Sequence, residues 1–93
     1  MHKDWPKMAT ELNGAIKEVR LGTPEVMQAF SAMATAATKA GALDAKTKEL
    51  IALAISVAIR CDGCVAFHSK AAVKHGATRD EVMETMGMAL YMG

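Results

Sequence analysis

The sequence predicts a single, small, all-α domain, and three observations support that prediction. Apolar residues recur at helical spacing through most of the 93 residues. No useful run alternates apolar and polar residues as a half-buried strand would. Capping residues and glycines divide the chain at intervals of a typical helix length. With no repeat or linker, residues 1–93 form one domain with five or more helices.

The first half of the chain predicts two helices. The first is expected at about residues 7–19 and ends at Leu21-Gly22. Thr23 then caps a second helix, which carries Pro24 in its first turn and continues to Gly41. The apolar residues of this second helix are expected to face the core: Val26, Met27, Phe30, Met33 and Ala37.

The second half of the chain predicts three more helices. Asp44 caps the first of them, which runs to about Ile59. Its second half is apolar on every side, which predicts burial all round. The next helix is expected at about residues 64–74. Thr78 and Glu81 form a capping box that opens the last helix. The apolar residues expected to face inward from it are Val82, Met86 and Leu90.

Composition indicates assembly and excludes several partners. A chain of 93 residues has a limited core, yet 52% of its residues are hydrophobic. We therefore expect copies of the chain to cover apolar surface on one another. The 11 basic and 10 acidic residues nearly balance, so neither nucleic acid nor an anionic membrane surface is expected as a partner.

The sequence predicts a cytoplasmic protein without a cofactor. The N-terminus lacks the apolar core of a secretory signal, and the longest apolar stretch, residues 50–59, has about half the length that a bilayer requires. In the cytosol, two closely spaced cysteines are more often catalytic, redox-active or metal-binding than structural. No Gly-rich phosphate loop, flavin motif or haem motif is present.

The central chemical feature is the run Cys61-Asp62-Gly63-Cys64 followed by His68. Residues three and four apart share a helix face, so one helical stripe presents two thiols and an imidazole. The run also starts a helix, where free backbone N–H groups favour a thiolate over a thiol. This pattern predicts a reactive dithiol that can close into a local disulfide.

Glu49 lies twelve positions before Cys61, near the head of the apolar helix. A short break separates that helix from the next, so the two are expected to be neighbours. A carboxylate beside an apolar run is costly to bury without a partner, and a His or thiol on the next helix would supply one. The ordinary alternative is a solvated acid beside Lys46 and Lys48.

Taken together, Glu49, Cys61, Cys64 and His68 resemble the signature of the AhpD-like alkylhydroperoxidases in the carboxymuconolactone decarboxylase superfamily. The resemblance covers about residues 24–92. The surrounding segments that share it are residues 46–54, the continuation from His68 to Ala72, and residues 76–82.

The resemblance implies an all-α fold that assembles into homo-trimers or homo-hexamers. It also implies a peroxidase or disulfide oxidoreductase in which Cys64 attacks the oxidised substrate and Cys61 is the more exposed, resolving thiol. Glu49 and His68 then form a proton relay that deprotonates Cys64. The implied substrate is a peroxide or disulfide, and the electron donor is a lipoyl domain, a thioredoxin-like protein or a small thiol.

One departure from the family pattern keeps other functions open. The family's peroxidases carry a histidine immediately before the second cysteine, where this chain has Gly63. Loss of that histidine removes one member of the relay, so a general disulfide reductase is the alternative to a strong peroxidase. The alternatives from other classes are a lactone decarboxylase and a non-catalytic helical assembly that senses redox state or binds zinc through the same four residues.

Two further charged residues lie close to the motif. Arg60 is interpreted as the polar end of the apolar helix, with an effect on the pKa of a neighbouring thiol as the alternative. His75 is interpreted as a partner of a helix C-terminus rather than as a catalytic group.

Overall fold

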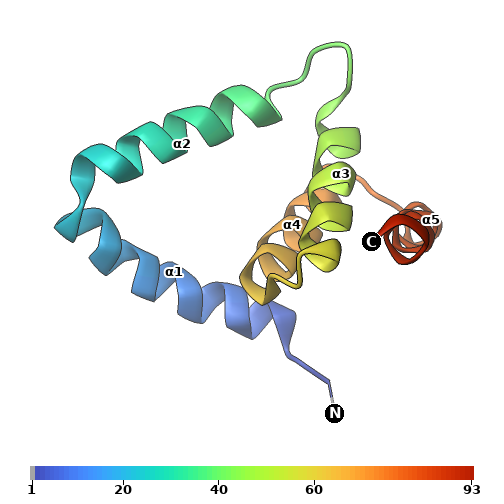
Figure 1. Cartoon of the computed structure of the whole chain (residues 1–93), viewed down its shortest axis with the longest axis horizontal. Coiled ribbons are helices and arrows are strands. Elements are labelled where there is room, and N and C mark those ends of the chain that lie inside the picture. The colour runs from blue at the N-terminus through green and yellow to red at the C-terminus, as the bar shows by residue number, and fades with distance from the viewer. Residues whose placement is uncertain (1) are drawn as a thin grey trace.

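Five helices account for most of residues 2–93, the residues that the computed structural model describes (Figure 1). No strand occurs among them, so the all-α prediction is confirmed. In chain order the helices are α1 (Trp5–Gly22), α2 (Pro24–Thr38), α3 (Ala45–Ala58), α4 (Asp62–Lys74) and α5 (Arg79–Met92).

The first two helices have bounds that differ from those predicted. α1 starts at Trp5, earlier than expected, because the Asp4 carboxylate caps it by accepting the Lys7 N–H at 3.0 Å. α2 begins at Pro24 as predicted, but the side chain of Thr23 makes no cap and bonds back to α1 instead. α2 ends at Thr38, before Gly41, because Lys39 has an extended ψ of 133°.

The caps predicted for the second half are confirmed. The Asp44 carboxylate accepts the Thr47 N–H at 2.7 Å at the start of α3. At the start of α5, the Thr78 hydroxyl accepts the Glu81 N–H at 3.1 Å, and the Glu81 carboxylate accepts the Thr78 N–H at 2.8 Å. These side chains satisfy backbone donors that the first helical turn leaves free.

The packed part of the molecule is built around α3 (Figure 1). α4 and α5 both pack against α3, and the first half of α1 crosses α4 on its other side. The buried apolar residues are few, and most are alanines, which allow helices to approach closely. They are Ala9, Leu53, Ala66, Ala72 and Ala89.

α2 does not face a core. It runs from the end of α1 toward the start of α3 and buries none of its residues (Figure 1). Phe30 is 56% exposed and Met33 is 62% exposed, so the predicted inward face of α2 is wrong for the single chain. A cavity of about 680 Å³ lies between α1, α2 and Phe67 of α4.

Two predictions of burial in the second half are also wrong for the single chain. α3 was expected to be buried all round, but Ile51 and Ile55 are 45% and 54% exposed because α4 and α5 cover only part of its circumference. Leu90, expected to face inward from α5, is 82% exposed. Val82 and Met86 are partly buried.

The overall dimensions reflect this incomplete packing. The radius of gyration is 14.0 Å, against about 12 Å for a compact domain of this length. The molecule measures 39 × 39 × 24 Å. None of the helices described in residues 2–93 combines the length and hydrophobicity needed to cross a bilayer.

Candidate redox site at the α3–α4 turn

A tight turn after α3 sets the position of the two cysteines. The Arg60 N–H donates to the Val57 carbonyl at 3.1 Å, and the Cys61 N–H donates to the Ser56 carbonyl at 3.0 Å. This pair of bonds is a Schellman motif, with Arg60 in the left-handed position at φ 59°. The motif reverses the chain within three residues and makes Cys61 the N-cap of α4.

The two cysteines are joined in a disulfide, with their Cα atoms 5.2 Å apart. Cys61 Sγ also accepts the Cys64 N–H at 3.2 Å. At a helix N-terminus, free N–H groups and the helix dipole favour negative charge. In the reduced protein, the same backbone donor would therefore stabilise a Cys61 thiolate.

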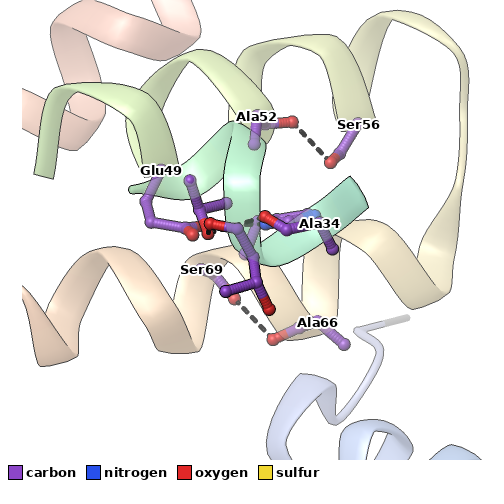
Figure 2. A network of polar contacts seen from close by, with 9 residues as sticks. Ala34, Glu49, Ala52, Ser56, Ala66 and Ser69 are labelled. Carbon is purple, nitrogen blue, oxygen red and sulfur yellow. Dashed lines mark hydrogen bonds and ion pairs between the residues drawn. The ribbon is translucent and has the colours of Figure 1, made fainter. Parts of the chain in front are cut away.

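Glu49 and His68 are brought together across the α3–α4 contact. His68 Nδ1 lies 2.7 Å from Glu49 Oε2, and Glu49 is only 7% exposed. Figure 2 shows Glu49 leaving α3 on the side that faces α4. The partner expected for a buried carboxylate at this position is therefore present, and the solvated alternative for Glu49 is wrong.

This contact leaves the second imidazole nitrogen available for chemistry. An ionised Glu49 accepts a hydrogen bond when Nδ1 carries the proton, which fixes the tautomer and orientation of the ring. Nε2 of His68 is then the acceptor. Because His68 follows Cys64 by four residues on α4, the imidazole and the thiol belong to the same helix face.

Ser56 is a site residue that the sequence analysis missed. It is 2% exposed, and its hydroxyl donates to the Ala52 carbonyl at 2.6 Å (Figure 2). Its own carbonyl accepts the Cys61 N–H, so it fixes the start of the dithiol turn. A lone serine in an apolar run, seven positions after Glu49 and so on the same face, was the available signal.

Leu12 of α1 is a second missed residue. A Cβ atom placed on Gly63 would lie 3.0 Å from Leu12 Cδ1. α1 thus covers the position between the two cysteines, and a side chain at residue 63 would displace Leu12. The absence of a side chain at residue 63 leaves room for that close approach.

The charges around the dithiol are partly paired. Lys3 forms an ion pair with Asp62, the first residue of α4. His75 lies at the other end of α4, as its C-cap, in keeping with its interpretation as a helix-end residue. Within residues 2–93, no three His, Cys, Asp or Glu side chains are grouped so that they could hold a metal ion.

Comparison with known proteins identifies the family of this site. Residues 24–93 match the carboxymuconolactone decarboxylase family. The chain belongs to that family. The resemblance expected from Glu49, Cys61, Cys64 and His68 is therefore confirmed at the level of the family.

A solved structure supports the same assignment. This family member resembles the crystal structure of an apo carboxymuconolactone decarboxylase family protein from Legionella pneumophila, with 49% identity and a TM-score of 0.93. The match covers 99% of this chain and 82% of the Legionella chain.

Two relatives known from sequence are uncharacterized proteins. One, from Cupriavidus necator, is 39% identical over 93 residues, which is 100% of this chain and 82% of the relative. The other, encoded in the cox locus of Paracoccus denitrificans, is 34% identical over 80 residues, covering 86% of this chain and 72% of the relative. Their names assign no activity to this family member.

Proposed function

We propose that this family member is a thiol–disulfide oxidoreductase, with Cys61 and Cys64 as its redox-active pair and a peroxide or a disulfide as its oxidised substrate. The observation that carries the proposal is the Cys61–Cys64 disulfide at the start of α4, one helical turn before a histidine that is bonded to a buried glutamate. Both oxidised and reduced states can form there without rearrangement of the helices.

The proposed reaction uses each cysteine once. The Cys64 thiolate attacks a peroxide oxygen and becomes a sulfenic acid, with release of an alcohol or water. The Cys61 thiolate then attacks Cys64 Sγ, the disulfide forms, and water leaves. With a disulfide substrate, Cys64 forms a mixed disulfide, Cys61 displaces the second thiol, and two substrate thiols are released.

Glu49 and His68 are proposed as the proton relay for Cys64. His68 Nε2 accepts the Cys64 proton, and the Glu49 carboxylate on Nδ1 stabilises the imidazolium that forms. The imidazolium then gives this proton to the departing oxygen or thiolate of the substrate. When the disulfide is reduced again, His68 passes to Cys64 a proton that comes from the donor thiol. The N-cap position of Cys61 fits the resolving role, because the Cys64 N–H stabilises the Cys61 thiolate.

The glycine at position 63 favours disulfide exchange over fast peroxide reduction. The relay here consists of Glu49 and His68, and Leu12 occupies the space next to Gly63. We propose a lipoyl domain, a thioredoxin-like protein or a small thiol as the electron donor. The proposed location is the cytoplasm, where such donors keep exposed thiols reduced.

The test follows thiol loss in the reduced protein after one equivalent of hydrogen peroxide, an alkyl hydroperoxide or a small disulfide. Both thiols should disappear together, and Cys64→Ser should abolish that loss. Glu49→Gln and His68→Ala should slow it by about 100-fold, the lower range for removal of an acid–base group. His75→Ala is the matched control and should leave the rate unchanged.

The outcomes separate the candidate functions. Fast loss with peroxides identifies a peroxidase, and fast loss with disulfides alone identifies an exchange enzyme. Loss at the rate of an ordinary thiol with every oxidant would contradict the proposal. A lactone decarboxylase would keep its activity in Cys64→Ser, because that reaction has no use for a dithiol.

A further inference from the structure

The residue that precedes the dithiol has an unfavourable backbone conformation. Arg60 has a φ of 59°, in the left-handed region that glycine adopts freely and other residues adopt at a steric cost. The end of α4 provides an internal comparison. There, Gly76 occupies the same position of the same motif at φ 87°, with N–H bonds from Gly76 to Val73 and from Ala77 to Ala72.

Among residues 2–93, the guanidinium group of Arg60 has no polar partner that explains its presence. The residue itself is exposed. A glycine would end α3 with less strain. The arginine therefore needs a reason outside the folding of the isolated chain.

The acidic side chains next to the disulfide are paired with residues other than Arg60. Asp62, between the two cysteines, is paired with Lys3, and Glu49 is paired with His68. The α4 N-terminus adds partial positive charge at the same place. A molecule that approaches Cys61 therefore meets an unpaired guanidinium on the preceding residue, while Asp62 and Glu49 are held by their own partners.

We propose that Arg60 is a specificity-determining residue that attracts anionic thiols to the Cys61–Cys64 disulfide. The substrate class is a small thiol that carries a carboxylate in addition to the reacting thiolate. This inference rests on the proposed function, because it concerns the reduction of the same disulfide. Arg60 acts by electrostatic attraction of the donor's carboxylate and does not take part in bond making.

The step that Arg60 favours is reduction of the Cys61–Cys64 disulfide, which consumes two donor thiols. A donor thiolate attacks Cys61 Sγ, forms a mixed disulfide and releases Cys64, which takes a proton from His68. A second donor thiolate attacks the donor sulfur and releases the Cys61 thiolate and the oxidised donor disulfide. The protein disulfide gains two electrons, and the two donors lose them.

The test compares three small thiols as reductants of the oxidised protein: 3-mercaptopropionate, 2-mercaptoethanol and cysteamine, which are anionic, neutral and cationic. Rate constants are expressed per thiolate and measured at low ionic strength, where charges act over about 30 Å at 0.01 M salt. We expect the anionic thiol to react faster than the cationic one. Arg60→Gln should lower the rate ratio of 3-mercaptopropionate to 2-mercaptoethanol, which differ by one charge, by about fivefold, the size expected for one pair of charges about 4 Å apart in water.

Three further variants make the result specific to Arg60. Arg60→Lys should keep the ratio, and Arg60→Glu should invert it. Arg79→Gln removes the same charge at the start of α5. Arg79 lies beyond the far end of α4, whose 13 residues span about 20 Å, so this variant should leave the ratio unchanged. In about 1 M salt, the wild-type preference should disappear.

Stability provides the readout that separates this role from a structural one. Arg60→Gly should raise the melting temperature by roughly 4 °C, because strain is relieved, while the preference for the anionic thiol is lost. A lower melting temperature with an unchanged ratio would show that Arg60 only stabilises the end of α3, and would overturn the inference. A disulfide that all three thiols reduce no faster than a simple dialkyl disulfide would instead contradict the proposed function.

Discussion

The position between the two cysteines shows how a distant helix can crowd one residue. Gly63 lies in the first turn of α4, where any residue can adopt the backbone conformation. The constraint comes from Leu12 on α1, which would lie 3.0 Å from a Cβ atom at position 63. Neither the spacing of the cysteines nor the local sequence contains that information.

We predict that Gly63→His destabilises the protein by about 1 kcal/mol, because the new side chain must displace Leu12. Urea unfolding of Gly63→His, Leu12→Ala and the double variant measures the effect. Leu12→Ala opens the space, so the double variant should be more stable than the sum of the single changes predicts, by about 1 kcal/mol. Strict additivity would show that α1 does not restrict position 63.

At the scale of the helices, an ion pair connects the starts of α3 and α5. Lys46 Nζ lies 2.7 Å from Glu81 Oε2, and the Glu81 carboxylate also takes part in the α5 capping box. The hydrogen bond from Lys46, followed by that from the Thr78 backbone, lowers the pKa of Glu81 from 4.5. The hydrogen bond to Glu81 raises the pKa of Lys46 from 10.5.

The sign of the resulting pH dependence follows from these directions. The contribution of Glu81 is present above its unfolded pKa of 4.5 and is lost as the pH falls through its lower folded value. The contribution of Lys46 is present below 10.5 and is lost as the pH rises through its higher folded value. The pair therefore stabilises the fold across the neutral range.

We predict that the melting temperature falls below pH 4.5 and that Glu81→Gln weakens this acid dependence. Calorimetry from about pH 3 to 7 is the measurement. Glu84→Gln, an exposed residue of the same helix, is the control and should melt with the wild-type pH profile. An unchanged acid dependence in Glu81→Gln would show that other carboxylates dominate the transition.

At the scale of the whole molecule, much of the apolar surface has no partner within the chain. α2 buries no residue, one face of α3 is exposed, and the apolar end of α5 is exposed as well. Large exposed apolar patches are uncommon on monomeric proteins. We therefore propose that copies of the chain assemble, with a homo-trimer or a homo-hexamer as the expected size.

We predict that light scattering coupled to gel filtration gives a mass that is a multiple of 9.9 kDa. Met33→Glu places a charge on the exposed apolar face of α2 and should reduce that mass and lower the melting temperature. Gln28→Glu, at an exposed polar position of the same helix, should do neither. A monomeric wild-type protein would contradict the assembly.

The sequence alone determined the helical fold and most helix starts. Asp44, Pro24 and the Thr78–Glu81 box are local signals, because a cap or a fixed φ acts within one turn. The dithiol could also be predicted from the sequence, because residues three and four apart on a helix are neighbours regardless of the rest of the chain. The family followed from the same four-residue pattern.

Only the tertiary structure decided which apolar faces are covered and what surrounds the dithiol. Helical periodicity marks a face as apolar, but it does not say whether this chain or another copy buries that face, and so the inward assignments for α2 and α3 were wrong for the single chain. The choice of His68 rather than a thiol as the direct partner of Glu49, and the approach of Leu12 to Gly63, depend on how helices meet. Such contacts between elements are set by three-dimensional packing and leave no regular spacing in the sequence.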